Sequence, residues 1–395
     1  MTTVAAPTLF DAIETVAPVV REYADESERI ARLAEPVVDA MRANRLFKGL
    51  APKTLDGYEI DPVGWYKAVE AAARIDGSFG WIMFINGASG LGGQSMPAEL
   101  SEQLIRDAGS VGAGSVFPFG KAVATEGGYI ANGRWTYASG IRHSDTVFGF
   151  ANIFDGETMR MLMPGTPAVA IVNVPTSDVE ILPSWDVCGL SGTGSNDFIM
   201  KDLFVPESQV SILGMPAPAN PHYAGPLYRL PFMTLFAQPI GAVALGIAQH
   251  AIDEVLELAK TKSPAAVGPA APLRERPMFH AQLAEAVACV NSARAWLHDK
   301  VREQYEMAEA GKSPDLNQRV ETQLAASNAT RSAYKAVEIM YLAGGGTSNF
   351  RKSPLQRCMR DIHAVTQHAG TNPATWEFTG ATMAGMPLQN PLILL

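Results

Sequence analysis

Cysteine, histidine and positive charge are all scarce in this sequence. Only three cysteines and seven histidines occur among 395 residues, and the cysteines are too widely spaced for a disulfide framework or a CxxC metal site. The net charge of -9 argues against nucleic acid or an anionic membrane surface as the main partner. No long uncharged apolar run and no basic-then-apolar leader occur. These absences predict a cytoplasmic protein that binds neither membrane nor nucleic acid.

Several motifs of common enzymes are also missing. The chain has no GxGxxG at a strand-to-helix turn, and therefore no nicotinamide site of its own is expected. P-loop, HExxH and GxSxG motifs are absent as well, and no metal site is predicted. The composition is that of a globular protein. Hydrophobic residues make up 47% and charged residues 18%, which is enough to bury a large core.

Apolar periodicity divides the chain into three regions. Helical spacing dominates to about Ser115, with one helix expected over Pro62–Ile75 and a fully buried one over Phe79–Leu91. Alternating, Gly-punctuated segments then predict a small β-barrel or sandwich, with a hairpin turn at Asn132–Gly133. Four long helices are expected after this region, and their ranges are Pro231–Lys262, Pro277–Ala310, Asp315–Leu342 and Pro354–Gln367.

The expected fold class is therefore α+β, with three domains. They are an N-terminal helical domain over 1–110, a β-barrel domain over 111–215 and a C-terminal helical bundle domain over 216–395. Two Pro-rich segments, 216–231 and 263–272, are read as connections within the last domain.

Two of the seven histidines, His363 and His368, lie beside an Arg-Asp pair at the end of the last long helix. The unperturbed pKa of imidazole is near neutrality, so a histidine in a pocket can hold or pass a proton. Residues five apart do not share a helix face, and the two histidines are therefore predicted to do different jobs. The alternative is that either one is a satisfied polar residue of a helix or its cap.

Four motifs follow one another along the chain. They are Gly133-Arg134-Trp135-Thr136-Tyr137-Ala138-Ser139-Gly140, Trp185 followed by Gly189-Leu190-Ser191-Gly192-Thr193-Gly194-Ser195, Arg276-Pro277-Met278-Phe279, and Gly345-Gly346 followed by Arg360-Asp361. In this order they resemble the acyl-CoA dehydrogenase superfamily, and within it the two-component flavin-dependent monooxygenases. The resemblance covers nearly the whole chain. It implies an N-terminal helical domain, a central β-barrel and a C-terminal four-helix bundle.

The resemblance also implies an activity. The chain would be the oxygenase component, and a separate NAD(P)H:flavin reductase would supply reduced flavin, FADH2 or FMNH2, by diffusion. Reaction of that flavin with O2 gives a C4a-hydroperoxide that hydroxylates a small, aromatic substrate. In the family, the bundle arginine and glycines contact a flavin bound mainly by a neighbouring subunit, which implies a homotetramer.

The implied cofactor-binding residues come from both halves of the chain. They are Phe117, Gly120, Trp135, Ser139, Thr193, Ser195, Arg276, Phe279, Gly345 and Gly346. Trp135 is expected to lay its indole against the flavin ring, Ser139 to hydrogen-bond near its N5 or C4a edge, and Arg276 to grip a phosphate. The alternatives are a core aromatic for Trp135, a turn residue for Ser139, a solvated charge for Arg276 and a helix end for the glycines.

The Arg-Asp segment distinguishes the branches of the superfamily. Many acyl-CoA dehydrogenases carry a glutamate base immediately before Gly-Thr, and an ungapped match places Ala369 there. Alanine cannot be a base. The resemblance instead assigns catalysis to His368, as hydrogen-bond donor or base, with Ser139 assisting and His363 as a second candidate. His143, just beyond Ser139, is a weaker catalytic candidate, and a structural place at the rim of the barrel is the preferred interpretation.

Aromatic residues on the helices are expected to wall the substrate pocket. They are Trp81, Phe84, Phe236 and Trp376, and their alternative role is plain core packing. Two other functions stay open at this point. One is an acyl-CoA dehydrogenase that holds oxidised FAD and passes electrons to a carrier, and the other is a non-catalytic helical scaffold that has lost its flavin.

Overall fold

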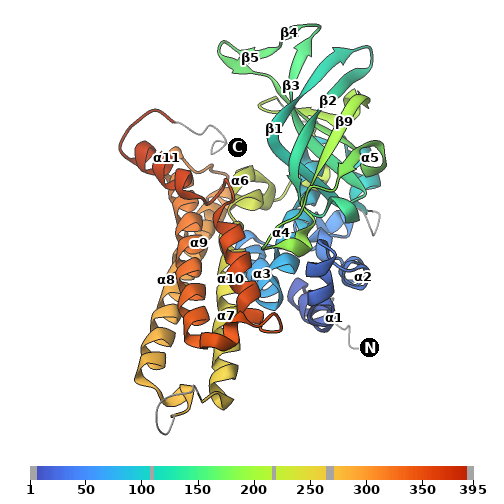
Figure 1. The fold of residues 1–395 in the computed structure, drawn as a ribbon. Coiled ribbons are helices and arrows are strands. Elements are labelled where there is room, and N and C mark those ends of the chain that lie inside the picture. The colour runs from blue at the N-terminus through green and yellow to red at the C-terminus, as the bar shows by residue number, and fades with distance from the viewer. Residues whose placement is uncertain (1–6, 107–110, 216–218, 264–270, 389–395) are drawn as a thin grey trace, which may run out of the picture. The chain divides into compact units, whose positions relative to one another are not determined.

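The computed structural model describes residues 7–106, 111–215, 219–263 and 271–388 (Figure 1). The two Pro-rich connections lie partly outside these ranges. The chain forms two compact units. The first comprises residues up to Ile60, Ile85–Asp186 and Ser191–Tyr228, and the second comprises Asp61–Phe84, Val187–Leu190 and the residues from Arg229 onward.

The first unit combines helices with a large sheet. Helix α1 (Leu9–Arg29) begins after Thr8, which forms a capping box with Asp11, and α2 (Glu35–Ala43) packs against it. After Pro97 the chain forms a single α-helical turn, α5 (Ala98–Ser101), which continues as a π-helical turn over Glu102–Arg106.

The sheet has eight strands, drawn in green in Figure 1. Its order is β10-β7-β3-β1-β2-β9-β8, and β4 pairs with β3. The strands are β1 (Gly112–Thr125), β2 (Gly128–Ala138), β3 (Thr146–Asp155), β4 (Thr158–Met159), β7 (Val169–Pro175), β8 (Glu180–Leu182), β9 (Asn196–Pro206) and β10 (Val210–Ile212). A separate ribbon pairs β5 (Met161–Met163) with β6 (Thr166–Pro167). The sequence predicts a small β-barrel or sandwich here. Among the described residues β10 and β8 do not pair with each other, so hydrogen bonds do not close this sheet into a barrel.

The hairpin predicted at Asn132–Gly133 is wrong. These residues lie inside β2, where the register with β9 shifts between Ala131 and Gly133. Both hydrogen-bonding ends of the Asn132 amide are satisfied by Asp202 on β9, which holds the irregular pair in the sheet. The tight turn instead follows Thr125 and contains Gly127, whose φ of 75° suits glycine.

The second unit is helical. Its helices are α3 (Pro62–Ile75), most of α4 (Gly77–Gly87), α6 (Phe232–Phe236), α7 (Ile240–Thr261), α8 (Pro277–Glu309), α9 (Leu316–Gly344), α10 (Pro354–Thr366) and α11 (Pro373–Met383). Helix α9 packs against α7, α8, α10 and α11, and α3 packs against α7. Figure 1 shows α7 to α10 running side by side. Within the described residues one stretch, Phe232–Thr261, is long and apolar enough to span a membrane, but 78% of its most apolar window is buried, as in a core helix.

Helices α3, α8, α9 and α10 agree closely with their predicted ranges. The single helix predicted over Pro231–Lys262 is divided into α6 and α7, and the helix predicted over Phe79–Leu91 ends at Gly87. Helix α3 begins after Asp61, which accepts a hydrogen bond from the Gly64 N–H, and proline occupies its first turn. The division into three domains stays a prediction, because α3 and most of α4 pack in the second unit together with the C-terminal helices.

Candidate active site

Three hydroxyl groups form a buried chain in the first unit. The Ser195 Oγ lies 2.7 Å from the Ser139 Oγ and 2.7 Å from the Thr193 Oγ1. All three residues are at most 5% exposed. Ser195 is therefore the bridge between the other two hydroxyls, and it orients the Ser139 hydroxyl.

Local backbone geometry brings these hydroxyls together. Ser139 directly follows β2, and Gly140, with a φ of 74°, turns the chain so that its N–H donates to the Thr193 carbonyl. Gly194, with a φ of 54°, makes the corresponding turn between Thr193 and Ser195. The predicted cluster of Ser139, Thr193 and Ser195 is thus assembled by two glycine turns.

Two buried polar atoms close to this cluster lack a partner among the described residues. They are the Asn86 Oδ1 and the His143 Nε2. The Asn86 amide donates to the carbonyls of Gly112 and Ser139, which ties it to the same segment. Burial, with Arg32 and Arg42 nearby, lowers the pKa of His143 to about 4. Asn86 was not predicted, although it is the one amide in the otherwise apolar segment Phe79–Leu91.

The prediction that the Trp135 indole faces a ligand is wrong. Its side chain is fully buried in the core of the sheet, stacked on Phe198 with ring centroids 5.2 Å apart. The indole N–H donates to the Phe150 carbonyl at 2.9 Å. The ring also lies against Gly120 and Gly149, where a Cβ would meet it at 2.3 and 2.6 Å. Gly120 therefore makes room for the indole. The cofactor contact predicted for Trp135 is replaced by core packing, and that of Gly120 stays a prediction.

Gly149→Ala is expected to destabilise the protein by about 1–3 kcal/mol, because the new methyl group overlaps the enclosed indole and the sheet leaves it little room to move. The measurement is the free energy of unfolding in urea. Gly92→Ala is the matched control in the same unit, since nothing lies within 4 Å of its Cβ position. Equal stability of the two variants would show that the indole can shift.

Phe117 remains available as a ligand contact. It lies within β1, is 49% exposed, and stacks on Phe119 with ring centroids 5.0 Å apart. The pairing of β1 with β3 is interrupted between Ser115 and Gly120, which gives this part of the strand its irregular path.

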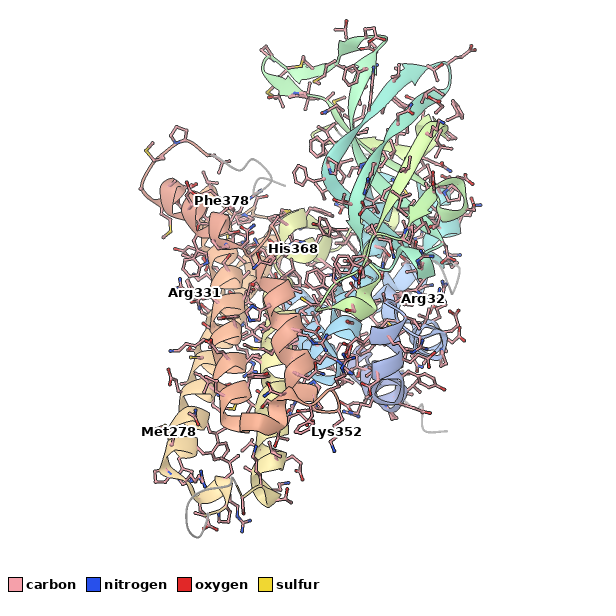
Figure 2. The ribbon with its side chains drawn as sticks, viewed as in Figure 1. Arg32, Met278, Arg331, Lys352, His368 and Phe378 are labelled. Carbon is pink, nitrogen blue, oxygen red and sulfur yellow. The ribbon has the colours of Figure 1, made fainter. Side chains whose placement is uncertain are left out.

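His368 lies just beyond the end of α10, and Figure 2 labels it. Its Nδ1 accepts a hydrogen bond from the Gly370 N–H at 3.0 Å, so the ring proton of the neutral imidazole is on Nε2. Burial lowers the pKa of His368 to about 4. Near neutral pH the residue is thus an uncharged imidazole that presents an N–H donor.

The predicted pocket aromatics separate into different roles. The Trp81 ring meets the His368 ring edge-on at 5.5 Å, whereas Phe84 packs edge-on against Trp81 and is completely buried. Phe84 is therefore a core residue and not a pocket wall. Phe236 is half-buried and stacks on Phe232, and Trp376 on α11 lies under the Arg331 guanidinium at 5.3 Å.

The two histidines occupy different environments, as their spacing predicts. His363 is an exposed residue of α10 whose ring meets Tyr334 of α9 edge-on at 5.0 Å. His368 lies after the helix, with its Nδ1 turned to the backbone. The geometry supports His368 as the chemical group and leaves His363 as the second candidate.

The Arg-Asp pair anchors a backbone segment. Asp361 accepts a hydrogen bond from the Leu190 N–H at 2.6 Å, and Arg360 donates to the Cys188 carbonyl at 2.6 Å. Between these contacts, a Cβ at Gly189 would meet the Arg360 carbonyl at 2.1 Å. Glycine is thus required there, and the pair fixes the residues that lead into Ser191 and Thr193.

A second carboxylate lies near Asp361. Burial, and then the charge of Asp76, raise the pKa of Asp361 to about 7, against the lowering effects of the Leu190 N–H, Arg357 and Arg360. The Arg357 guanidinium lies 3.7 Å from the Asp76 carboxylate. The Asp361 carboxyl therefore titrates near neutral pH in the folded protein.

The remaining predicted cofactor residues lie at the other end of the helical unit. Arg276 precedes α8 and is partly buried, and its Nε donates to the Ala271 carbonyl. Gly345 ends α9 with a φ of 54°, and nothing lies within 4 Å of a Cβ at Gly346. Phe279 is only 3% exposed, which leaves little of its ring for a ligand.

Known proteins resemble this chain in sequence over most of its length. The family model described as "Acyl-CoA dehydrogenase, C-terminal domain" matches residues 239–373. The indole-3-acetate monooxygenase of Pseudomonas putida is 30% identical over 361 residues, which cover 91% of this chain and 89% of that protein. The flavin-dependent monooxygenase oxygenase subunit HsaA of Rhodococcus jostii is 28% identical, with 96% and 99% covered.

Solved structures agree with the sequence relatives. The crystal structure of 3-HSA hydroxylase from Rhodococcus sp. RHA1 has a TM-score of 0.88 and 26% identity, and the match covers 98% of this chain and 99% of that one. The fold thus defines an acyl-CoA dehydrogenase-like protein, with helices and sheet in the order that the sequence predicts.

The chain belongs to the two-component flavin-dependent monooxygenases of this fold. It is therefore an enzyme, the oxygenase that uses reduced flavin and O2, and it depends on a separate reductase for the flavin. This membership decides against the acyl-CoA dehydrogenase and the non-catalytic scaffold that the sequence left open.

Proposed function

We propose that this oxygenase hydroxylates a small aromatic molecule of the phenol or indole type, with His368 as the residue that acts on the reacting atoms. The observation that carries the proposal is the fixed, neutral imidazole of His368 edge-on to Trp81. The stacked pair Phe232 and Phe236 and the indole of Trp376 add flat apolar surface in the same unit.

The first unit contains a donor set that fits a flavin. Ser139, Ser195 and Thr193 offer linked hydroxyls, and the nearby Asn86 and His143 retain buried polar atoms without protein partners among the described residues. The polar edge of a flavin ring offers both acceptors and donors to such a set. When bound, reduced flavin supplies the electrons that activate O2.

Ser139 is proposed as the hydroxyl that donates to the cofactor. The Ser195 hydroxyl lies between the hydroxyls of Ser139 and Thr193. When Ser195 donates a hydrogen bond to the Ser139 oxygen, the Ser139 O–H is left to donate to the cofactor. Thr193 and Ser195 then hold Ser139 in one orientation. Phe117, with its exposed ring on β1, is retained as a further cofactor contact.

His368 is proposed to act as a hydrogen-bond donor. Its Nδ1 is engaged by the Gly370 N–H and its proton is on Nε2, so the ring can donate but has no open nitrogen to accept a proton from a substrate. Of the two roles left open by the sequence, donor and base, this geometry favours the donor. A phenol oxygen or the activated oxygen is the expected acceptor.

The position of Arg276, Gly345 and Gly346 supports an oligomer. Along α9, Gly345 is 22 residues from Gln323, which bonds the segment after His368, and at 1.5 Å per residue this separation is about 33 Å. Gly345 and the His368 segment of one chain are therefore too far apart to contact the same flavin ring. We therefore retain a homotetramer with a four-helix bundle, in which Arg276 and the two glycines serve a neighbour's flavin. The composition favours the cytoplasm.

The test of the function uses the protein with chemically reduced FMN or FAD, without any reductase. Mixing with ¹⁸O2 and a panel of phenols and indoles is expected to yield a product that carries one labelled oxygen atom. Mass spectrometry measures the label, and reduced flavin without protein is the control. If all consumed O2 is released as hydrogen peroxide with every compound in the panel, the aromatic substrate class is wrong.

A further inference from the structure

We infer that Gln323 is a positioning residue that keeps the His368 imidazole in its donor form. The inference rests on the role proposed for His368. Gln323 is a residue of α9, 3% exposed, and its side-chain N–H group donates to the Gly370 carbonyl at 2.5 Å. Gln323 belongs to none of the sequence motifs, and its hydrogen bond goes to the Gly370 backbone, not to a histidine side chain.

The link to His368 runs through one glycine. The carbonyl of Gly370 is held by Gln323, and the N–H of the same residue donates to the His368 Nδ1 at 3.0 Å. A Cβ at Gly370 would lie 3.2 Å from that Nδ1, so the close approach suits glycine. Glycine is also the residue with the freest backbone, and it therefore needs an external anchor to hold this orientation.

Other contacts also hold this segment, and one of them acts on the peptide plane of the Gly370 N–H. The His368 carbonyl accepts from the N–H groups of Thr371 and Asn372, and the Thr375 hydroxyl donates to the Ala369 carbonyl at 3.3 Å. The Ala369 carbonyl and the Gly370 N–H lie in one peptide plane, so the 3.3 Å Thr375 bond holds Gly370 from one side and the 2.5 Å Gln323 bond holds it from the other. Among the described residues, Gln323 is the side chain that bonds the Gly370 backbone itself from another helix.

The consequence is control of the tautomer. While the Gly370 N–H points at the His368 Nδ1, a proton on Nδ1 would place two hydrogen-bond donors against each other. The ring proton therefore stays on Nε2. When Gln323 is removed, Gly370 can turn its N–H away and the Nδ1 becomes free to carry the proton or to react. The Nε2–H donor is then present in only part of the molecules.

The first test does not depend on activity. Diethyl pyrocarbonate acylates the unprotonated nitrogen of a neutral imidazole, and in the wild type that nitrogen of His368 is covered by the Gly370 N–H. Gln323→Met is expected to raise the acylation rate of His368 by about fivefold or more relative to the exposed His363, a difference of about 1 kcal/mol in protection. Peptide mass spectrometry measures both rates in one sample.

Gln304→Met is the matched control. Gln304 is also a buried glutamine. Among the described residues its side chain bonds Thr234, Thr322 and the Gln318 carbonyl, and none of these bonds reaches the segment 368–372. Its replacement should leave the acylation ratio as in the wild type. Gln323→Leu, which also removes the N–H donor, should behave like Gln323→Met and is available if the methionine variant does not fold. An unchanged His368 rate in the folded variants overturns the inference.

A double-mutant cycle then separates this inference from the proposed function. In wild-type background Gln323→Met should lower the fraction of consumed O2 recovered as product by about threefold or more, whereas in a His368→Ala background it should have no further effect. Additive effects would mean that Gln323 acts on structure alone. If His368→Ala leaves the product fraction unchanged while the acylation rate still rises, the role of His368 is wrong and the tautomer control stands.

Discussion

His368→Ala is expected to lower the product yield per O2 consumed by about 10- to 100-fold, with hydrogen peroxide released instead. The Nε2–H of a neutral imidazole is the donor that is lost, and a hydrogen bond to a charged or developing anionic oxygen contributes about 1.5–3 kcal/mol. Flavin affinity should change little, because the proposed hydroxyl set of Ser139, Thr193 and Ser195 does not include His368. Parallel assays of product, peroxide and reduced-flavin affinity measure these effects.

Two further variants decide between donor and base. His368→Gln retains an N–H donor but cannot accept a proton, so it should recover part of the yield if His368 is a donor and none if it is a base. His363→Ala is expected to have a smaller effect, since that ring is exposed on α10. A wild-type yield for His368→Ala would exclude the residue from the chemistry.

The pH dependence of the yield provides an independent check. Because burial lowers the pKa of His368 to about 4, the imidazole is neutral from about pH 5 upward and the Nε2–H donor persists. His368 should therefore cause no change in yield between about pH 5.5 and 8. A fall in yield with a midpoint near the ordinary histidine pKa, absent in His368→Gln, would show that the ring is charged in the working enzyme.

Asp361→Asn is expected to make the protein more stable at pH 8 and to reduce the loss of stability as the pH rises from about 4 to 7. The folded-state pKa of Asp361 is raised to about 7 from 3.8, so over this range the folded protein holds a proton that the unfolded chain has released. Stability therefore falls with rising pH, by at most about 1.4 kcal/mol per pH unit for one group. Above pH 7 the cost is constant.

Asparagine keeps the carbonyl oxygen that accepts the Leu190 N–H and removes the buried charge beside Asp76. The measurement is urea unfolding at pH 5, 6, 7 and 8 for both proteins, since the difference between them isolates residue 361. Asp299→Asn is the control, because that carboxylate is exposed on α8 of the same unit. If Asp361→Asn is less stable at pH 8, the ionised carboxylate stabilises the Cys188–Leu190 anchor instead.

Local signals explain how much of the fold followed from sequence. The range Pro62–Ile75 was predicted residue for residue, because an N-cap aspartate and a first-turn proline are signals within the helix itself. Helix α10 was predicted to within one residue and also has a proline in its first turn, and its length correctly separated His363 from His368. The order of the four motifs was enough to identify the family, since motif order is a property of the chain alone.

Contacts between distant residues account for the errors. Asn132–Gly133 has the composition of a turn, but two hydrogen bonds to Asp202 keep it in the sheet. Trp135 stands in a family motif, yet Gly120, Gly149 and Phe198 enclose its ring. Neither outcome is encoded in spacing, because the partners come from other strands.

The sequence by itself determined the helices, the α, β, α order and the family, and it singled out His368 and Ser139 as residues of interest. The tertiary structure decided what each can do. It turned the Gly370 N–H to the His368 Nδ1, placed Ser195 between two hydroxyls, and tied Asp361 to the Leu190 backbone. A proton's position and a carboxyl group's pKa depend on neighbours within a few ångströms, and folding brings those neighbours from different parts of the chain.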